Sequence, residues 1–454
     1  MVVPPGTSRP PRDRSHGSVA SSPRTRSDPI QVITVRRLPA TFSALSSPAY
    51  RRFIPAQFIG STGVWMQRIA QDWLVLELTG SAAAVGLVVA MQFLPMLLLG
   101  LWGGVLVDRF PIRRLLVLTQ SIAAALALLL GGLSLAGVVQ VWHVYAIALA
   151  LGLVVVVDGP ARQAFVSELV PSSQVRNAVG LNSTVFQFSG VLGPAVSGVL
   201  VAVVGNGWAF MINGLACTAV AAIVFTVRPQ FTRPVVPRAP GALRQGLRYI
   251  MSTSEVFWAI LLVALAGLMA FNLPVLLATM ADSEFHTGVS GYSLLTTVNA
   301  VGALVGGLWA GSRTTTSRLR SLTGGLGALG VLYATMAVVP GQWAFTALLV
   351  LSGVATMSFL IGANSLIQLS TAPEVRGRVM SVYMMVLLGG QSIAGPLVGR
   401  FSDWLGPRAA LVLCGVVLLL VTAVLAALMA RQAHLRLALQ RERWAPRLSI
   451  VRVP

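Results

Sequence analysis

Lysine is absent from this chain of 454 residues, so all 33 basic residues are arginine. A phosphate-binding loop that ends in Gly-Lys-Ser/Thr requires that lysine, and ATP hydrolysis by such a loop is therefore excluded. Cysteine occurs only twice, within apolar stretches, which excludes a disulfide framework. The histidines are too few and too scattered to be metal ligands or catalytic bases. We expect no enzymatic activity, no metal and no cofactor. The residues concerned are Cys217, Cys414, His16, His143, His286 and His434.

Charge of either sign is also scarce. Charged residues make up 10% of the chain, hydrophobic residues make up 55%, and the mean hydropathy is +0.79. Soluble proteins carry roughly 25% charged residues. The net charge of +20 would suggest a nucleic-acid partner in a soluble protein. Here the arginines lie in tails and between long apolar stretches, so we expect a polytopic membrane protein whose partner is the lipid bilayer, and no nucleic acid.

Apolar stretches near the roughly 20 residues that span a bilayer occur twelve times. Arginines crowd every second connection between them, which predicts that both termini are cytoplasmic. We expect a multi-pass protein of the bacterial inner membrane. The expected spans are 53–78, 82–107, 113–135, 141–165, 177–201, 208–227, 255–280, 290–311, 321–339, 343–369, 379–399 and 409–430.

The long hydrophilic segment 228–254 divides these spans into two sets of six. The two sets also share sequence, because Gly193-Pro194 with Gly198 matches Gly395-Pro396 with Gly399 at an offset of about 200 residues, as in duplicated halves. The predicted fold is all-α, with twelve transmembrane helices in two pseudo-symmetric six-helix bundles. The expected segments are a disordered basic tail (1–50), a first bundle (51–227), a central loop (228–254), a second bundle (255–430) and a basic tail (431–454).

A short turn with paired glycines, one acid and several arginines separates the second and third expected spans. The glycines allow close helix packing. This pattern resembles the second loop of the major facilitator superfamily, where glycine is followed by three variable residues, aspartate, arginine and more basic residues. The resemblance implies a conformational gate made of Gly104, Asp108, Arg109, Arg113, Arg114 and Arg162. Pro111-Ile112 stands where the family often has glycine. A generic basic loop is the alternative.

The first expected span contains an arginine and an acid. Trp65, Arg68 and Asp72 follow at helical spacing and share one face. Charges at membrane depth are costly unless they pair or line a wet cavity. Two interpretations remain open: a structural ion pair, or a cavity in which Asp72 carries a proton. Asp158 is the second candidate proton carrier, and its alternative role is to cap a helix end with Arg162.

The fifth expected span carries small residues and a proline at Gly190, Gly193, Pro194 and Gly198. This resembles the antiporter motif of drug-exporting facilitators, although one glycine ends it where the family has two. The arginine found in the fourth span of related proton-coupled exporters is missing from 146–157, so Arg68 and Asp72 would have to replace it. The end of the fourth span, Asp158-Gly159-Pro160-Ala161-Arg162, together with Trp65-Met66-Gln67, resembles the exporter branch that contains the enterobactin and macrolide efflux proteins. This resemblance extends over residues 50–430.

The resemblance implies a monomeric exporter of a small amphipathic molecule that works by alternating access and proton antiport. An importer or uniporter is one alternative, and a membrane sensor or scaffold is another. We also expect Asp108 to contact the start of the eleventh helix, near Gly377, when the cytoplasmic side closes, because a helix N-terminus favours a carboxylate. Candidate cavity residues are Trp65, Gln71, Gln92, Gln187, Asn299 and Asn364.

Overall fold

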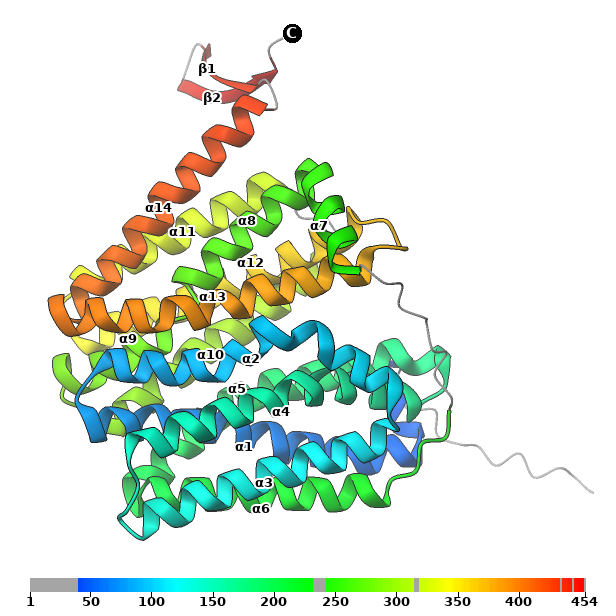
Figure 1. The fold of residues 1–454 in the computed structure, drawn as a ribbon. Coiled ribbons are helices and arrows are strands. Elements are labelled where there is room, and N and C mark those ends of the chain that lie inside the picture. The colour runs from blue at the N-terminus through cyan, green and yellow to red at the C-terminus, as the bar shows by residue number, and fades with distance from the viewer. Residues whose placement is uncertain (1–39, 232–241, 314–317, 433–434, 443–444, 453–454) are drawn as a thin grey trace, which may run out of the picture. The chain divides into compact units, whose positions relative to one another are not determined.

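The structure is a computed structural model, which describes residues 40–231, 242–313, 318–432, 435–442 and 445–452. All of these residues belong to one compact unit, Ala40–Pro454. The first half of this unit consists of helices that lie side by side (Figure 1). They are η1 (Ala40–Ser46), α1 (Pro48–Thr79), α2 (Ala82–Arg109), α3 (Ile112–Leu135), α4 (Val141–Glu168), η2 (Ser172–Gln174), α5 (Val175–Val204) and α6 (Asn206–Thr226).

The second half follows a short connecting helix, α7 (Ala242–Ser252). Its helices are α8 (Ser254–Met269), α9 (Leu273–Thr279), η3 (Met280–Glu284), α10 (Gly288–Ser312), α11 (Leu319–Val338), α12 (Gln342–Leu369), α13 (Arg376–Leu405) and α14 (Pro407–Gln432). The predicted class, a helical membrane protein with two six-helix halves, is confirmed. A two-stranded antiparallel hairpin after α14, which the sequence did not predict, pairs β1 (Leu435–Glu442) with β2 (Ala445–Arg452).

The seventh expected span, 255–280, is broken rather than continuous. It consists of α8, α9 and the π-helical η3. The break falls at Asn272, whose side chain donates a 2.9 Å hydrogen bond to the Leu268 carbonyl oxygen. Pro274 follows at the start of α9 and cannot donate a backbone hydrogen bond to the preceding turn. The Tyr333 hydroxyl donates to the Ala270 carbonyl oxygen, 3.0 Å away, and so stabilises the broken end of α8.

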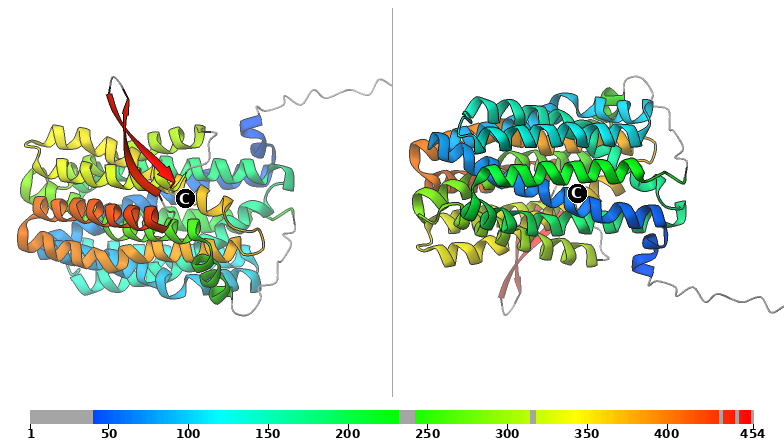
Figure 2. Two further views of the ribbon diagram at one scale, coloured as in Figure 1. Left: turned by 90° about the horizontal axis from the view of Figure 1, so that it is seen from above. Right: turned by 90° about the horizontal axis from the view of Figure 1, so that it is seen from below.

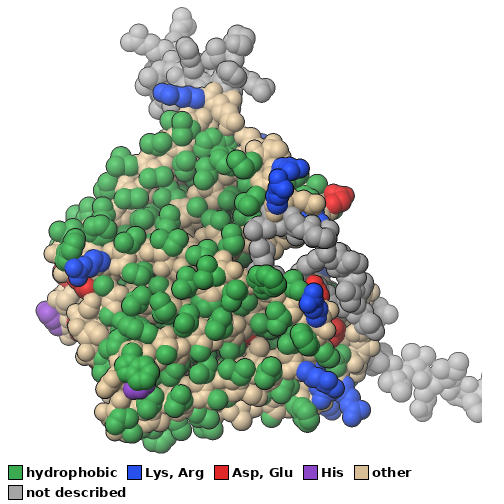
Figure 3. All heavy atoms as spheres, viewed as in Figure 1, with side chains coloured by type: hydrophobic (Ala, Val, Ile, Leu, Met, Phe, Trp, Pro, Cys, Tyr) green, Lys and Arg blue, Asp and Glu red, His purple; other side chains and the backbone are tan. Residues whose placement is uncertain are grey.

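Eleven of the described segments are long and apolar enough to cross a membrane. Helix α1 is not among them, because arginines, an aspartate and a glutamate interrupt its apolar residues. It nevertheless has 32 residues and packs against α5 and α6. Large apolar side chains cover much of the face in Figure 3, and charged residues gather toward its edges. This surface is suited to contact with lipid, with α1 as the twelfth span.

Consecutive helices are joined differently at the two ends of the bundle. At one end the connections contain glycines with positive φ, a conformation that costs glycine little. Gly205 alone joins α5 to α6, and Gly406 alone joins α13 to α14. We call this the glycine end, defined by Gly80, Gly137, Gly205, Gly288, Gly341 and Gly406. Most of the described arginines lie in or beside the connections at the other end, and we call it the basic end. It includes Arg109, Arg113, Arg114, Arg176, Arg228, Arg248, Arg313 and Arg378.

Part of the segment expected to be a disordered tail is folded. Residues 40–50 form η1 and the first turn of α1. The Ala44 amide donates to the Asn177 side chain at 2.9 Å, and the Ser47 hydroxyl donates to the Leu169 carbonyl oxygen at 2.6 Å. The Tyr50 hydroxyl donates to the Ala178 carbonyl oxygen at 2.9 Å. These bonds attach η1 and the start of α1 to α5 and to the end of α4, so the last eleven residues of the expected tail 1–50 belong to the folded unit. Residues 1–39 lie outside the described residues.

The two halves meet toward the glycine end. The larger apolar core contains residues from both halves, whereas the smaller core is built from the first half alone, near the basic end. Gly86 of α2 lies against the backbone of Gly395 of α13, and Gly399 lies against Ala82, so closely that an added Cβ would clash. Gly198 of α5 meets Ser293 of α10 in the same way. Figure 2 shows the helices of the second half in front in the view from above and those of the first half in front in the view from below. The bundle is therefore closed at its glycine end.

Candidate functional site

Asp72 lies at the contact between the two halves. It is buried in α1, and one of its carboxylate oxygens accepts a 3.0 Å hydrogen bond from the Tyr292 hydroxyl of α10. Its other oxygen, Oδ1, is buried without a hydrogen-bond partner among the described residues. The Tyr292 ring stacks on Trp73 at a centroid distance of 6.3 Å. The carboxyl group thus joins the halves through one oxygen, and its second oxygen can take a proton without breaking that bond.

Arg68 lies one turn before Asp72, but no ion pair within 4.0 Å joins the two among the described residues. The Arg68 guanidinium group instead lies between aromatic rings of the first half. Its guanidinium carbon lies 5.1 Å from the centroid of the Trp65 ring and 5.2 Å from that of Phe93. Such cation–π contacts stabilise an arginine that is partly removed from water. The structural ion pair, one of the two interpretations left open, is therefore replaced by aromatic contacts of Arg68, while Asp72 binds the opposite half.

Asp158 has a complete set of hydrogen-bond partners within the first half. It accepts from Thr119 at 2.8 Å and from Gln120 at 2.9 Å, both on α3. Arg162 donates two hydrogen bonds to it, at 3.0 and 2.8 Å, and donates a third to Gln57 of α1 at 2.6 Å. The cluster links α1, α3 and α4. Helix α4 continues past Gly159 and Pro160 to Glu168, so Asp158 does not cap a helix end as the alternative supposed.

The residues of the expected gate do not form one cluster. Arg162 pairs with Asp158 on α4. Arg113 donates to the Phe225 carbonyl oxygen and lies over the Phe225 ring, at 5.2 Å, at the end of α6. Arg109 and Arg114 are exposed. Asp108 is partly buried in the last turn of α2, and Gly104 is buried one turn before it. Val375, the N-cap residue of α13, has an apolar side chain that cannot cap the helix, and Gly377 beside it is exposed.

The glycines of the fifth span pack α5 against both halves. A Cβ at Gly193 would meet the Cβ of Trp65, and one at Gly190 would touch the indole ring at 3.5 Å. Gly198 instead meets Ser293 across the contact between the halves. Pro194 lies inside α5, which remains helical from Val175 to Val204. The motif therefore fixes the helix that carries Arg68 and Asp72.

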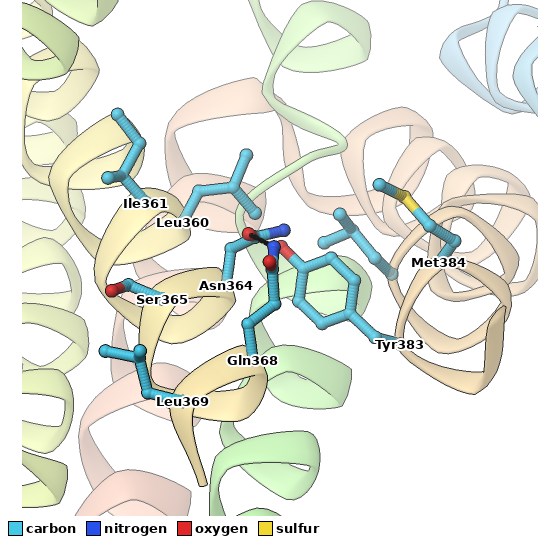
Figure 4. Close-up of a pocket in the computed structure, with 9 residues that line it drawn as sticks. Leu360, Ile361, Asn364, Ser365, Gln368, Leu369, Tyr383 and Met384 are labelled. Carbon is cyan, nitrogen blue, oxygen red and sulfur yellow. Dashed lines mark hydrogen bonds between the residues drawn. The ribbon is translucent and has the colours of Figure 1, made fainter. Parts of the chain in front are cut away.

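A cavity of about 460 Å³ lies in the second half, nearer the basic end (Figure 4). Its apolar wall surrounds the side-chain amides of Asn364 and Gln368, which are hydrogen-bonded at 2.5 Å, and the Tyr383 ring lies beside them. Of the six residues expected in the substrate cavity, Asn364 is the one that lines it. Its lining residues are Leu360, Ile361, Asn364, Ser365, Gln368, Leu369, Tyr383, Met384 and Leu387.

The other expected cavity residues lie elsewhere. Gln71 donates to the Val144 carbonyl oxygen at 3.4 Å, and Asn299 accepts from Ser352 at 3.2 Å, so both stabilise helix packing within one half. Gln187 reaches the Met357 sulfur at 3.8 Å across the two halves. The Trp65 indole nitrogen is buried without a hydrogen-bond partner among the described residues. Gln92 is partly buried on α2.

The sequence did not indicate two residues that join the halves. Tyr292 occurs near the start of an apolar span, and nothing in its surroundings indicates that it faces an acid 220 positions earlier. Asp403 lies near the end of α13, and its carboxylate binds the start of α2. The sequence feature that could have indicated them is their position, because both residues lie near a span end that is followed or preceded by a short glycine turn.

Comparison with known proteins agrees with this geometry. A family model described as transmembrane secretion effector matches residues 39–451. Macrolide efflux protein A of Streptococcus pyogenes is 24% identical over 365 residues, which are 79% of this chain and 90% of that protein. The enterobactin exporter EntS of Shigella flexneri is 25% identical over 394 residues, which are 82% of this chain and 92% of that protein. A bacterial homologue of the lysosomal transporter Spinster, solved in an inward-facing, unoccupied conformation, superposes with a TM-score of 0.70 at 16% identity, over 85% of this chain and 97% of that one.

Two helical halves that meet around a buried acid, together with these matches, define an exporter of the major facilitator superfamily. Within that class, the chain belongs to the transmembrane secretion effector family.

Proposed function

We propose that this protein exports a small amphipathic molecule from the cytoplasm by alternating access, and that proton entry through Asp72 drives the export. The observation that supports the role of Asp72 is its position. Among the described residues it is the only acidic side chain that is buried, and it lies at the contact between the halves. Its free oxygen provides a place for a proton.

Separation of the halves at the glycine end would break the bond between Asp72 and Tyr292. Water would then replace the tyrosine hydroxyl, and Asp72 would exchange protons with the outer side. When the halves close again at this end and separate at the basic end, the carboxyl group returns to Tyr292 and releases its proton to the cytoplasmic side. Asp72 would therefore bind a proton differently in the two conformations. Such a difference in affinity is what allows a proton to shift the equilibrium between them.

The cavity supports a substrate with both apolar and polar parts. Its leucine, isoleucine and methionine side chains would contact a hydrocarbon or ring surface, and its amides and phenol would orient polar groups. A size of about 460 Å³ suits a small molecule. The relatives from Shigella and Streptococcus are named for enterobactin and macrolides, which is consistent with such a substrate. The arginines of the basic end support a cytoplasmic location for that end, and we propose that the protein acts as a monomer.

Everted membrane vesicles test the proton-coupling proposal. Uptake of Hoechst 33342, ethidium or rhodamine 6G into vesicles energised with a proton gradient is compared for wild type, Asp72→Asn and a control. Glu77→Gln is the control, because Glu77 is an acid on the same helix that binds Trp73 and Asn206 within the first half. We expect Asp72→Asn to abolish gradient-driven uptake while protein level and dye binding are preserved. Full gradient-driven uptake by Asp72→Asn would refute the role of Asp72.

A further inference from the structure

Asp403 of the second half binds the N-terminus of a helix in the first half. Its carboxylate accepts hydrogen bonds from the Ser81 hydroxyl at 2.6 Å, from the Ala82 amide at 2.6 Å and from the Ala83 amide at 3.1 Å. Both carboxylate oxygens are used. The first amides of a helix have no partner inside the helix, and their aligned dipoles favour a negative charge. Asp403 supplies that charge to α2 from α13.

This contact continues the seam along which the halves meet. Gly395, Gly399 and Asp403 follow each other at intervals of four residues, on one face of α13. The two glycines lie against Gly86 and Ala82 of α2. Asp403 is exposed at the end of this row. The close backbone packing at the glycines holds the carboxylate within reach of α2, and separation of the halves at this end would remove it.

The same two helices have the reverse arrangement at the basic end. Helices α2 and α13 run in opposite directions, and α2 carries Asp108 in its own last turn. Val375, the N-cap residue of α13, has an apolar side chain that cannot cap the helix. Helix α2 ends with Asp108 at the basic end, where α13 begins. Helix α13 ends near Asp403 at the glycine end, where α2 begins. In this structure the acid of α13 is bound to the start of α2.

We propose that Asp403 is a positioning residue of the transport cycle, which stabilises the state closed at the glycine end by capping α2 across the two halves. The proposal rests on alternating access, as proposed for the function, but it is independent of protons. In the opposite state the cap is broken, and Asp403 and the α2 amides are hydrated. Asp403 therefore sets the ratio of the two states, and Asp108 is expected to act on the reverse side of the same equilibrium.

Two other acids near the glycine end, Glu77 and Glu284, bind partners within their own halves. Glu77 binds Trp73 and Asn206 within the first half. Glu284 pairs with Arg408 within the second half at 2.8 Å, with both side chains 30% exposed. Glu284→Gln is therefore a matched control, because it removes an acid of similar exposure and a charged hydrogen bond at the same end without touching the contact between the halves.

The test measures the two states from opposite sides with a thiol-reactive maleimide. In full-length protein with Cys217→Ala and Cys414→Ala, Ser293→Cys reports opening at the glycine end, because Ser293 is buried against Gly198. In a separate variant, Ser365→Cys in the cavity reports opening at the basic end. Asp403→Asn keeps the size of the side chain but removes its charge and presents an NH₂ group to helix amides.

We expect Asp403→Asn to raise the labelling rate at position 293 and to lower it at position 365, with a shift of about tenfold in the ratio, which corresponds to about 1.4 kcal/mol. Glu284→Gln should change neither rate. Asp403→Glu keeps the charge and should restore part of the wild-type ratio. High salt should reduce the difference between wild type and Asp403→Asn, because an exposed charge is screened.

Unchanged labelling at both positions in Asp403→Asn would overturn the proposal, and so would faster labelling at both, because that indicates a loosened protein and not a changed state. If Asp403→Asn does not accumulate in the membrane, Ser81→Ala removes one of the three bonds and must shift the ratio in the same direction for the proposal to stand. The labelling does not depend on a proton gradient. If the vesicle assay refutes the role of Asp72, the labelling result can still be interpreted. If the labelling refutes the role of Asp403, the vesicle result still stands.

Discussion

Replacing Tyr292 by phenylalanine measures how strongly Asp72 holds the two halves together. The substitution removes the hydroxyl that donates to Asp72 and leaves the ring that stacks on Trp73. A neutral hydrogen bond contributes about 0.5–1.5 kcal/mol net, and one to a charged group about 1.5–3 kcal/mol. At about 1.4 kcal/mol for a factor of ten, these ranges predict a shift of about 2- to 12-fold if Asp72 is protonated, and about 12- to 140-fold if it is ionised.

The assay is pulsed electron–electron distance measurement between spin labels at Thr226→Cys and Ser381→Cys, two exposed positions at the basic end of opposite halves. The two states give separate distance populations, and Tyr292→Phe should enrich the one closed at the basic end. Tyr333→Phe is the matched control, because the Tyr333 hydroxyl is equally buried but donates to Ala270 within the second half. If Tyr292→Phe shifts the populations no further than Tyr333→Phe, the bond to Asp72 does not hold the halves together.

Three further predictions concern the basic end. Asp108→Asn should insert normally, shift the population toward the state open at the basic end and slow transport, while labelling of Ser365→Cys should increase; unchanged labelling with wild-type transport would make Asp108 a loop cap only. Deletion of residues 1–39 should preserve dye transport, whereas deletion of 1–47 removes the Ser47 cap and should lower stability in detergent by about 1 kcal/mol; equal melting of both would contradict this. Arg162→Leu leaves Asp158 and Gln57 without their shared partner and should destabilise the protein by about 3–5 kcal/mol in thermal melting, with exposed Arg114→Leu as the control.

The number and class of the helices could be predicted from the sequence because a bilayer-spanning helix needs a long apolar stretch, which is a local property. Helix α1 shows the limit of hydropathy, since Arg68 and Asp72 lower its apolar character, although the expected span 53–78 lies within it. The break at Asn272 was missed, although Pro274 marked it. Apolarity averaged over a span does not register a single interrupted turn.

The candidate site could be predicted only in part, because helical spacing fixes which residues share a face and not what they face. The pair Arg162–Asp158 is four residues apart on one helix, so it could be anticipated. The partners of Asp158 on α3 depend on how the helices rotate against each other. Arg68 and Asp72 were placed on one face correctly, yet Asp72 binds Tyr292 from the other half. The roles assigned to these residues stay predictions.

The glycine turns make the two ends of the bundle differ in their capacity to change length during evolution. Where Gly205 or Gly406 is the whole connection, an inserted residue would have to be absorbed by unwinding a helix end. A side chain at a glycine of positive φ would also be strained. At the basic end, the connection between α6 and α8 already contains an additional helix, α7. Insertions, deletions and newly acquired regulatory segments should therefore accumulate among relatives at the basic end, while the glycine end keeps its length.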